Sequence, residues 1–194
     1  MIRHISYVLE ECLETRTPRV ACLLLFHGVL FGRRPETAGN RKREKGINMY
    51  QLNTHASFDS AHFLAGYEGK CRNLHGHRWK LSVTIQKEKV EEQGQTRGMV
   101  VDFGELKDKV KEIADEFDHA LIVEKDTLKT KTIEALREED FRIIEVKFRP
   151  TAENFARYFY DRIKQDGYDV SYVEVYETPN NCAIYGEQRW KFLK

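Results

Sequence analysis

The sequence has few of the features that mark secreted, membrane or nucleic-acid-binding proteins. Its four cysteines, among 194 residues, show no C-x-x-C spacing, so they predict no disulfide scaffold, and a reducing, cytoplasmic setting is expected. No apolar stretch reaches the roughly 18 residues that a membrane-spanning helix needs. Lys and Arg (32) nearly balance Asp and Glu (31), and the net charge of +1 predicts no strong field toward nucleic acid or membrane.

The composition changes near Met49. Residues 1–48 contain nine Lys and Arg against five Asp and Glu, a net charge of 9 − 5 = +4, whereas residues 49–194 contain 23 against 26, a net charge of −3. An apolar run at 20–32 precedes two arginines instead of a small-residue cleavage site, which argues against a signal peptide. We therefore divide the chain into an extension, 1–48, expected to be disordered or a mis-assigned start, and a single domain, 49–194.

Residues 41–46 bear on that extension. Their sequence, RKREKG, can be written entirely with purine-only codons, as in a bacterial ribosome-binding site a few codons ahead of a start. We hypothesise that the working protein starts at Met49, and the alternative is a native, loosely ordered extension. An N-terminal mass measurement on the natively expressed protein distinguishes the two.

Alternation and capping patterns predict an α+β domain. Strands are expected at 50–58, at 79–86 with strict alternation, at 99–101, at 172–176 and at 182–185. Asp102 caps a helix that ends near residues 118–119, and Thr151 caps a second helix that Gly167 ends. The charged segment 126–149 is expected to hold a short helix and then a strand at 142–148. This order is typical of helices on one face of an antiparallel sheet.

Three of the seven histidines crowd into 16 residues. His75 and His77 are two apart at the entrance to the strand at 79–86, so their side chains should point to the same side. His62, at the end of the first strand, could supply a third imidazole. Three neutral nitrogen ligands suit zinc and leave its fourth position open, as in catalytic sites. The alternative is a set of surface histidines in a turn.

Cys71 lies four residues before His75 and has three interpretations. It could be a fourth zinc ligand, which would make the site structural. It could instead be a nucleophile or base, because a thiol near a metal and imidazoles has a lowered pKa. A buried structural thiol is the third alternative.

Two further carboxylates, those of Asp118 and Glu177, are candidates for a functional role. Asp118 precedes His119 at a helix end, where a carboxylate can orient a histidine for proton transfer, although a helix C-terminus also favours a cation by itself. Glu177 follows two valines at period two and should point toward the core, where it needs a partner. That partner is either a Lys or Arg, or a pair of donors on a ligand.

Six short motifs together resemble the 6-pyruvoyl-tetrahydropterin synthase / 6-carboxytetrahydropterin synthase family, and the bacterial 6-carboxy enzymes in particular. They are FDSAH ending at His62, CRNLHGH at 71–77, VDF at 101–103, DH at 118–119, PTAEN at 150–154 and ETP at 177–179. The resemblance covers about 50–187 and implies the tunnelling fold, a four-stranded antiparallel sheet with two helices on one face. It also implies a homo-oligomer, a hexamer built as a dimer of trimers, with substrate bound between subunits.

The resemblance assigns roles to individual residues. His62, His75 and His77 match the family's ligands for Zn²⁺. Cys71 matches the catalytic thiol, and Asp118 with His119 matches the pair that assists proton transfer. The positions matching substrate-binding residues of the pterin pocket are Glu177, Thr151 and Glu153. The segment 126–149 is longer than the family's usual link, so a lid or an added contact between subunits is expected there.

The implied activity is a lyase reaction in the biosynthesis of 7-deazaguanine and queuosine precursors. It is the conversion of 7,8-dihydroneopterin triphosphate to 6-carboxy-5,6,7,8-tetrahydropterin, with release of triphosphate and acetaldehyde. The bacterial start signal favours this product over the pyruvoyl product of 6-pyruvoyl-tetrahydropterin synthase. A non-catalytic, zinc-stabilised binding module is the alternative from another class. No nucleic-acid or membrane partner is expected, because residues 49–194 carry a net charge of −3 and no basic stripe.

Overall fold

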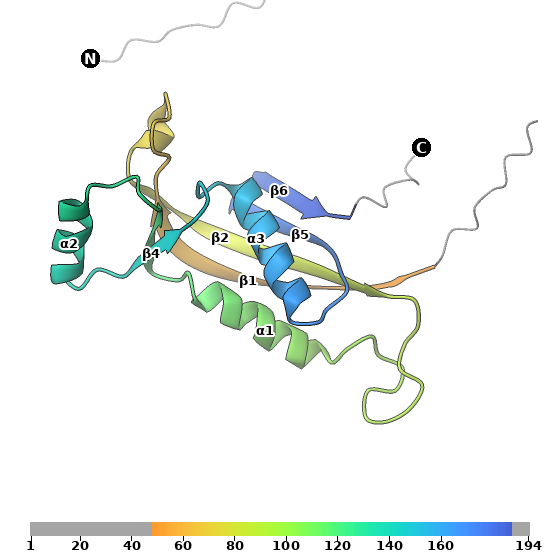
Figure 1. Cartoon of the computed structure of the whole chain (residues 1–194). Helices are drawn as coiled ribbons and strands as arrows, with labels where there is room; N and C mark the ends of the chain where they lie inside the picture. Colours follow the sequence, from red (N-terminus) through yellow and green to blue (C-terminus); the bar gives the residue numbers. More distant parts are fainter. Residues whose placement is uncertain (1–47, 188–194) are drawn as a thin grey trace, which may run out of the picture. The chain divides into compact units, whose positions relative to one another are not determined.

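The computed structural model describes residues 48–187, so all but the last residue of the predicted extension 1–48 lies outside the described residues. The domain contains six strands, three α-helices and a short 3-10 helix (Figure 1). In chain order these are β1 (Tyr50–His62), η1 (Lys70–Arg72), β2 (His75–Lys87), α1 (Phe103–Asp115), β3 (Ala120–Glu124), α2 (Thr130–Glu138), β4 (Ile143–Val146), α3 (Ala152–Gln165), β5 (Val170–Thr178) and β6 (Asn181–Gly186).

All six strands form one mixed sheet in the order β4-β3-β1-β2-β5-β6. The pairs β1–β2, β2–β5 and β5–β6 are antiparallel, whereas β1–β3 and β3–β4 are parallel. The prediction of an α+β fold is confirmed, but the four-stranded antiparallel sheet is wrong in strand number and in the direction of two strands. The missed strand β3 is a run of only five residues without alternation, too short to be recognised by periodicity.

The predicted strand at 99–101 is also wrong. Backbone groups there bond within the loop that follows β2: Glu91 N–H donates to the carbonyl of Met99, and Gly98 N–H donates back to Glu91. The loop therefore satisfies its own polar groups and does not join the sheet.

The helices α1 and α3 cover one face of the sheet, and α2 lies beside β4 (Figure 1). Asp102 caps α1 by accepting a hydrogen bond from Gly104 N–H, and Thr151 caps α3 by accepting one from Asn154 N–H, as predicted. None of the helices between residues 48 and 187 is long and apolar enough to cross a membrane. The segment 126–149 forms α2 and β4, which confirms the expected short helix followed by a strand.

The core lies between the sheet and these two helices. The strictly alternating strand β2 buries its odd-numbered positions 79–85 against both helices, and α3 contributes three large side chains to the same cluster. Trp79 is fully buried and contacts the rings of Phe58 and Phe155. On the opposite face Asn53 donates hydrogen bonds to the hydroxyls of Ser82 and Thr84, so this face is polar but satisfied.

Candidate metal and catalytic site

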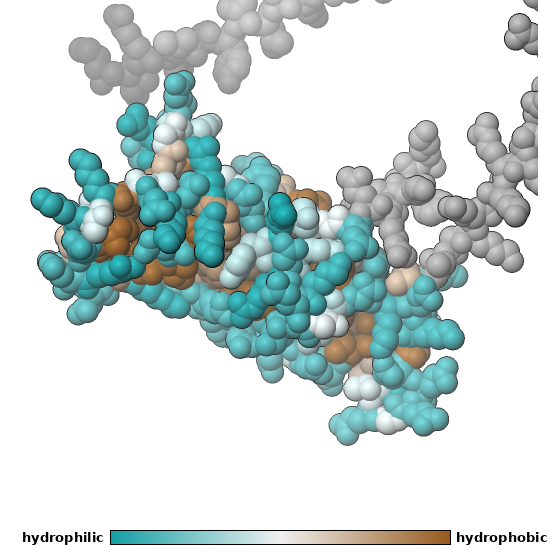
Figure 2. Space-filling view, in the orientation of Figure 1, coloured by the Kyte–Doolittle hydropathy of each residue, from teal (hydrophilic) through white to brown (hydrophobic). Residues whose placement is uncertain are grey.

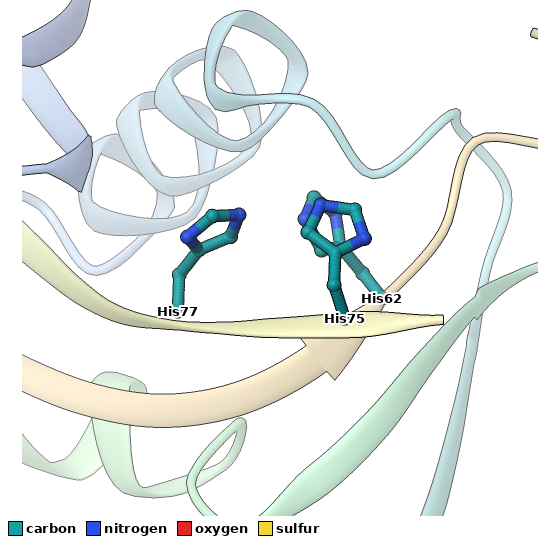
Figure 3. Close-up of side chains that lie close together, drawn as sticks. All are labelled: His62, His75 and His77. Carbon is teal, nitrogen blue, oxygen red and sulfur yellow. The ribbon is translucent and has the colours of Figure 1, made fainter. Parts of the chain in front are cut away.

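The three histidines come from the paired ends of two strands. His62, the last residue of β1, lies opposite His75, the first residue of β2, and His77 lies opposite Ser60. All three imidazoles project to the same side of the sheet, toward the segment that leads into α3 (Figure 3). Their ligand atoms lie within 4.8 Å of one another, so the structure brings together the trio that the sequence predicts.

Hydrogen bonds orient two of these rings. Nδ1 of His62 donates to the carbonyl of Pro150 at 2.8 Å, and Nδ1 of His75 donates to the carbonyl of Asn73 at 2.7 Å. A carbonyl can only accept, so the proton sits on Nδ1 and Nε2 is left as a lone-pair donor for a metal. His62 is only 1% exposed, and its Nε2 has no hydrogen-bond partner. A buried polar atom without a partner indicates a missing ligand.

Burial favours the neutral, metal-binding form of His62 and His77. It lowers the pKa of His62 to about 4; the nearby His75 and His77 add to this shift, and the Pro150 carbonyl opposes it. Burial also lowers the pKa of His77, although Glu177 pulls that pKa upward. Three neutral nitrogen donors fit a divalent metal such as zinc and leave room for a further ligand.

Cys71 lines a cavity next to the cluster. It belongs to η1, is half-buried, and shares a cavity of about 330 Å³ with Thr151, Glu153 and Glu177. The compact group of metal-ligating atoms found within residues 48–187 does not include the Cys71 sulfur. A thiol in a cavity wall suits the interpretation of Cys71 as a base, and its role as a fourth zinc ligand stays an alternative prediction.

Glu177 lines the cavity and lies near two of the three histidines. It lies near the end of β5, and its Oε1 is 3.6 Å from Nε2 of His62 and 3.7 Å from Nε2 of His77. The carboxylate thus points to the helix-covered side of the sheet, as the alternation predicts. Within residues 48–187 its ion-pair partners are imidazoles and not the Lys or Arg of the alternative.

Asp118 and His119 form the expected pair in the turn between α1 and β3. Nδ1 of His119 is 2.7 Å from Oδ2 of Asp118, and Oδ1 of Asp118 accepts the N–H of Asp59 at 2.8 Å. His119 N–H in turn donates to the Asp59 carbonyl at 2.7 Å, with His119 in a left-handed conformation (φ 50°). The hydrogen bonds from Asp59 and His119 lower the pKa of Asp118, the former contributing most.

His119 of this pair lines a different cavity from Cys71. This second cavity, of about 710 Å³, has His119, Arg142, Leu74 and Phe141 among its walls. Leu74 and Phe141 are 64% and 60% exposed, and Figure 2 shows apolar surface in the region of α2. A single chain therefore presents the thiol and the Asp–His pair in separate pockets.

Sequence reasoning missed Arg142, which holds the turn. Its guanidinium donates to the carbonyls of Asp118 and Glu116, each at 2.9 Å, at the end of α1. These partners are backbone atoms, so no pattern of side chains signals the contact. Arg142 lies in the charged segment 126–149, where one charged side chain among many has no distinguishing feature.

Solved structures share this fold. A protein of Wolinella succinogenes superposes with a TM-score of 0.58 at 24% sequence identity, over 73% of this chain and 99% of its own. The 6-pyruvoyl tetrahydropterin synthase of Caenorhabditis elegans gives a TM-score of 0.52 at 24% identity, over 72% and 96%. At these identities the likeness defines a fold class, that of the pterin synthases.

Sequence comparison defines the family. Residues 51–188 match the family described as 6-pyruvoyl tetrahydropterin synthase, and the chain belongs to this family. The 6-carboxy-5,6,7,8-tetrahydropterin synthase of Haemophilus influenzae is 38% identical over 142 residues, 72% of this chain and 100% of that protein. The enzyme of the same name from Aquifex aeolicus is 34% identical over 129 residues, 61% and 77%. The resemblance noted in the six motifs is confirmed.

Proposed function

We propose that this protein is a zinc-dependent lyase that converts 7,8-dihydroneopterin triphosphate to 6-carboxy-5,6,7,8-tetrahydropterin, releasing triphosphate and acetaldehyde. The observation that carries the proposal is the cluster of three neutral imidazoles next to a cavity walled by Cys71 and two carboxylates. Relatives that bear the name of this activity support it. A cytoplasmic role in making 7-deazaguanine and queuosine precursors belongs to the same proposal.

The residues present fit a bound zinc ion. His62 has a buried Nε2 without a partner, and His75 and His77 complete a facial set of nitrogen donors. When bound, the metal would act as a Lewis acid that stabilises negative charge developing on substrate oxygen.

The protein's own groups supply the remaining chemistry. A thiolate at Cys71 is suited to move protons on the substrate side chain, with His119 as its partner and Asp118 orienting that imidazole. A carboxylate at Glu177 can accept two parallel hydrogen bonds from the amino-pyrimidinone edge of a pterin, and Glu153 and Thr151 line the same cavity. Such contacts would fix the ring so that the reacting carbons lie over the histidine cluster.

The separation of Cys71 from His119 supports a site shared between subunits. The two residues line different cavities of one chain, so a working pair requires the thiol of one protomer and the Asp–His turn of another. The edge strands β4 and β6 offer unpaired backbone groups through which copies could join. We therefore propose a homo-oligomer, a hexamer assembled as a dimer of trimers.

Mixed oligomers test the shared site directly. Cys71→Ala and His119→Ala are each expected to be inactive alone, whereas oligomers co-refolded from both variants should regain part of the wild-type turnover, because some interfaces then combine two intact halves. Mixing each variant with itself is the control. No recovery in hybrids whose assembly is verified by native mass spectrometry would contradict the shared site.

Product analysis separates the candidate reactions. Incubation of zinc-loaded protein with dihydroneopterin triphosphate should yield a 6-carboxy pterin and acetaldehyde by mass spectrometry. A 6-pyruvoyl product would move the protein to the alternative reaction of its family. In the binding-module alternative, Cys71→Ser would lose zinc or unfold, whereas the catalytic proposal predicts that this variant keeps zinc and fold but loses turnover.

A further inference from the structure

The position of Glu177 relative to the histidine nitrogens carries an additional inference. Its Oε1 is 3.6 Å from Nε2 of His62 and 3.7 Å from Nε2 of His77, and the same nitrogens belong to the compact cluster of metal-ligating atoms. Ligand atoms that surround one ion tetrahedrally at about 2.1 Å lie about 3.4 Å apart. The carboxylate oxygen thus lies at ligand spacing from two of the three histidines, outside the compact group that the three imidazoles form by themselves.

The contact between Glu177 and the two imidazoles is not a hydrogen bond. The proton of His62 is on Nδ1, where it donates to Pro150, so Nε2 presents a lone pair toward the carboxylate. A carboxylate also presents lone pairs, and both distances exceed that of a hydrogen bond. A cation placed between the carboxylate and the imidazole nitrogens would give both sides a partner at these distances.

We propose that Glu177 is the fourth ligand of the metal in the substrate-free protein. This inference rests on the proposed function, in which the three histidines hold a divalent metal. It gives Glu177 a role beyond recognition of the pterin edge, because a ligand that approaches the metal must first displace the carboxylate. The released carboxylate would then be free to accept hydrogen bonds from the ring, which couples opening of the metal to recognition of the substrate.

Cobalt(II) provides a test that does not depend on turnover. Co²⁺ affinity is measured by competition with a chelator, and coordination is followed by the visible absorption of the bound ion, for wild type, Glu177→Gln and Glu153→Gln. Glu153 is the matched control, since it lines the same cavity as Glu177, whereas the contacts with His62 and His77 come from Glu177. We expect Glu177→Gln to weaken binding by at least about tenfold and to alter the absorption bands, and Glu153→Gln to do neither.

The possible results separate this inference from the proposed function. Wild-type affinity and an unchanged spectrum in Glu177→Gln would overturn the role of Glu177 and leave the three-histidine site intact. Equal changes in both variants would also overturn it, since they would indicate a general effect of charge in the cavity. If the wild-type protein binds no Co²⁺, the metal site and this inference are both overturned. If it binds metal but does not turn over dihydroneopterin triphosphate, only the proposed reaction is contradicted.

Discussion

The two clusters of candidate catalytic groups are held in opposite ways. His62 is 1% exposed, packs against the buried Trp79 and is oriented by a carbonyl from another segment. The side chain of His119 is 80% exposed and is held by its neighbour Asp118 and by backbone bonds to Asp59. The histidine cluster therefore reaches into the protein interior through His62, whereas the Asp–His turn is a surface feature.

This difference has a physical reason. Metal ligands must keep several atoms at set distances before the ion arrives, and close packing with fixed tautomers provides that rigidity. In the proposed oligomer, His119 would serve a neighbouring chain and so has to remain accessible until that chain covers it. Substitutions should therefore act differently in the two clusters.

Loss of His62 should have the largest effect. We expect His62→Ala to abolish high-affinity metal binding and to lower turnover by about 1,000-fold or more, because several kcal/mol of charge stabilisation are lost. Metal content by mass spectrometry and the rate of pterin formation measure both. His55→Ala, on the exposed side of the same strand, is the control. Stoichiometric metal in His62→Ala would disprove the ligand assignment.

Removal of the buried Trp79 ring, which packs against the histidines, should have the second largest effect. Trp79→Ala is expected to lower the free energy of unfolding by about 3–5 kcal/mol, the usual cost of truncating a buried aromatic side chain. Phe103→Ala removes a ring that is 62% exposed and should cost under about 0.5 kcal/mol. Urea titrations of the metal-free proteins give the free energy of unfolding of each variant. Equal losses in the two variants would contradict the buried packing of Trp79 beneath the histidines.

A smaller effect is expected where Arg142 supports the turn. Arg142→Ala loses two hydrogen bonds to carbonyls at the end of α1, and because the side chain is exposed we expect a cost of about 1 kcal/mol. Arg157→Ala, which loses only a surface ion pair to Asp161, should cost less than about 0.5 kcal/mol. Thermal melts measure the unfolding temperatures, and equal values for the two variants would contradict the supporting role of Arg142.

The smallest effect concerns the stability that Asp118 contributes, and it should become visible at low pH. The pKa of Asp118 in the folded protein lies below the ordinary 3.8, so the unfolded chain binds the proton more readily. The charged carboxylate therefore contributes stability above pH 3.8, and this contribution is lost as the pH falls through the lower folded value. Asp118→Asn should lose less stability than wild type below about pH 4 in urea titrations. Parallel pH profiles would contradict the bonding described for this turn.

Much of the domain could be predicted from local patterns. The alternation at 79–86 identified β2 and its buried face, and the caps at Asp102 and Thr151 located both covering helices. The three histidines could be grouped because two of them share a strand face and the third ends the preceding strand. The strand β3 was not recognised, since a five-residue run carries little periodic signal, whereas β4 lies within the strand predicted at 142–148.

The sequence by itself determined which residues could do chemistry and which side of its strand each would face, because strand alternation is a local property. Only the tertiary structure decided which of those groups meet. Pairing of β1 with β2 places His62 opposite His75. The segment before α3 supplies the Pro150 carbonyl that orients His62, and β5 brings Glu177 close to Nε2 of His62. The separation of Cys71 from His119 was likewise decided by the fold, since contacts between distant segments depend on packing and register that no local pattern encodes.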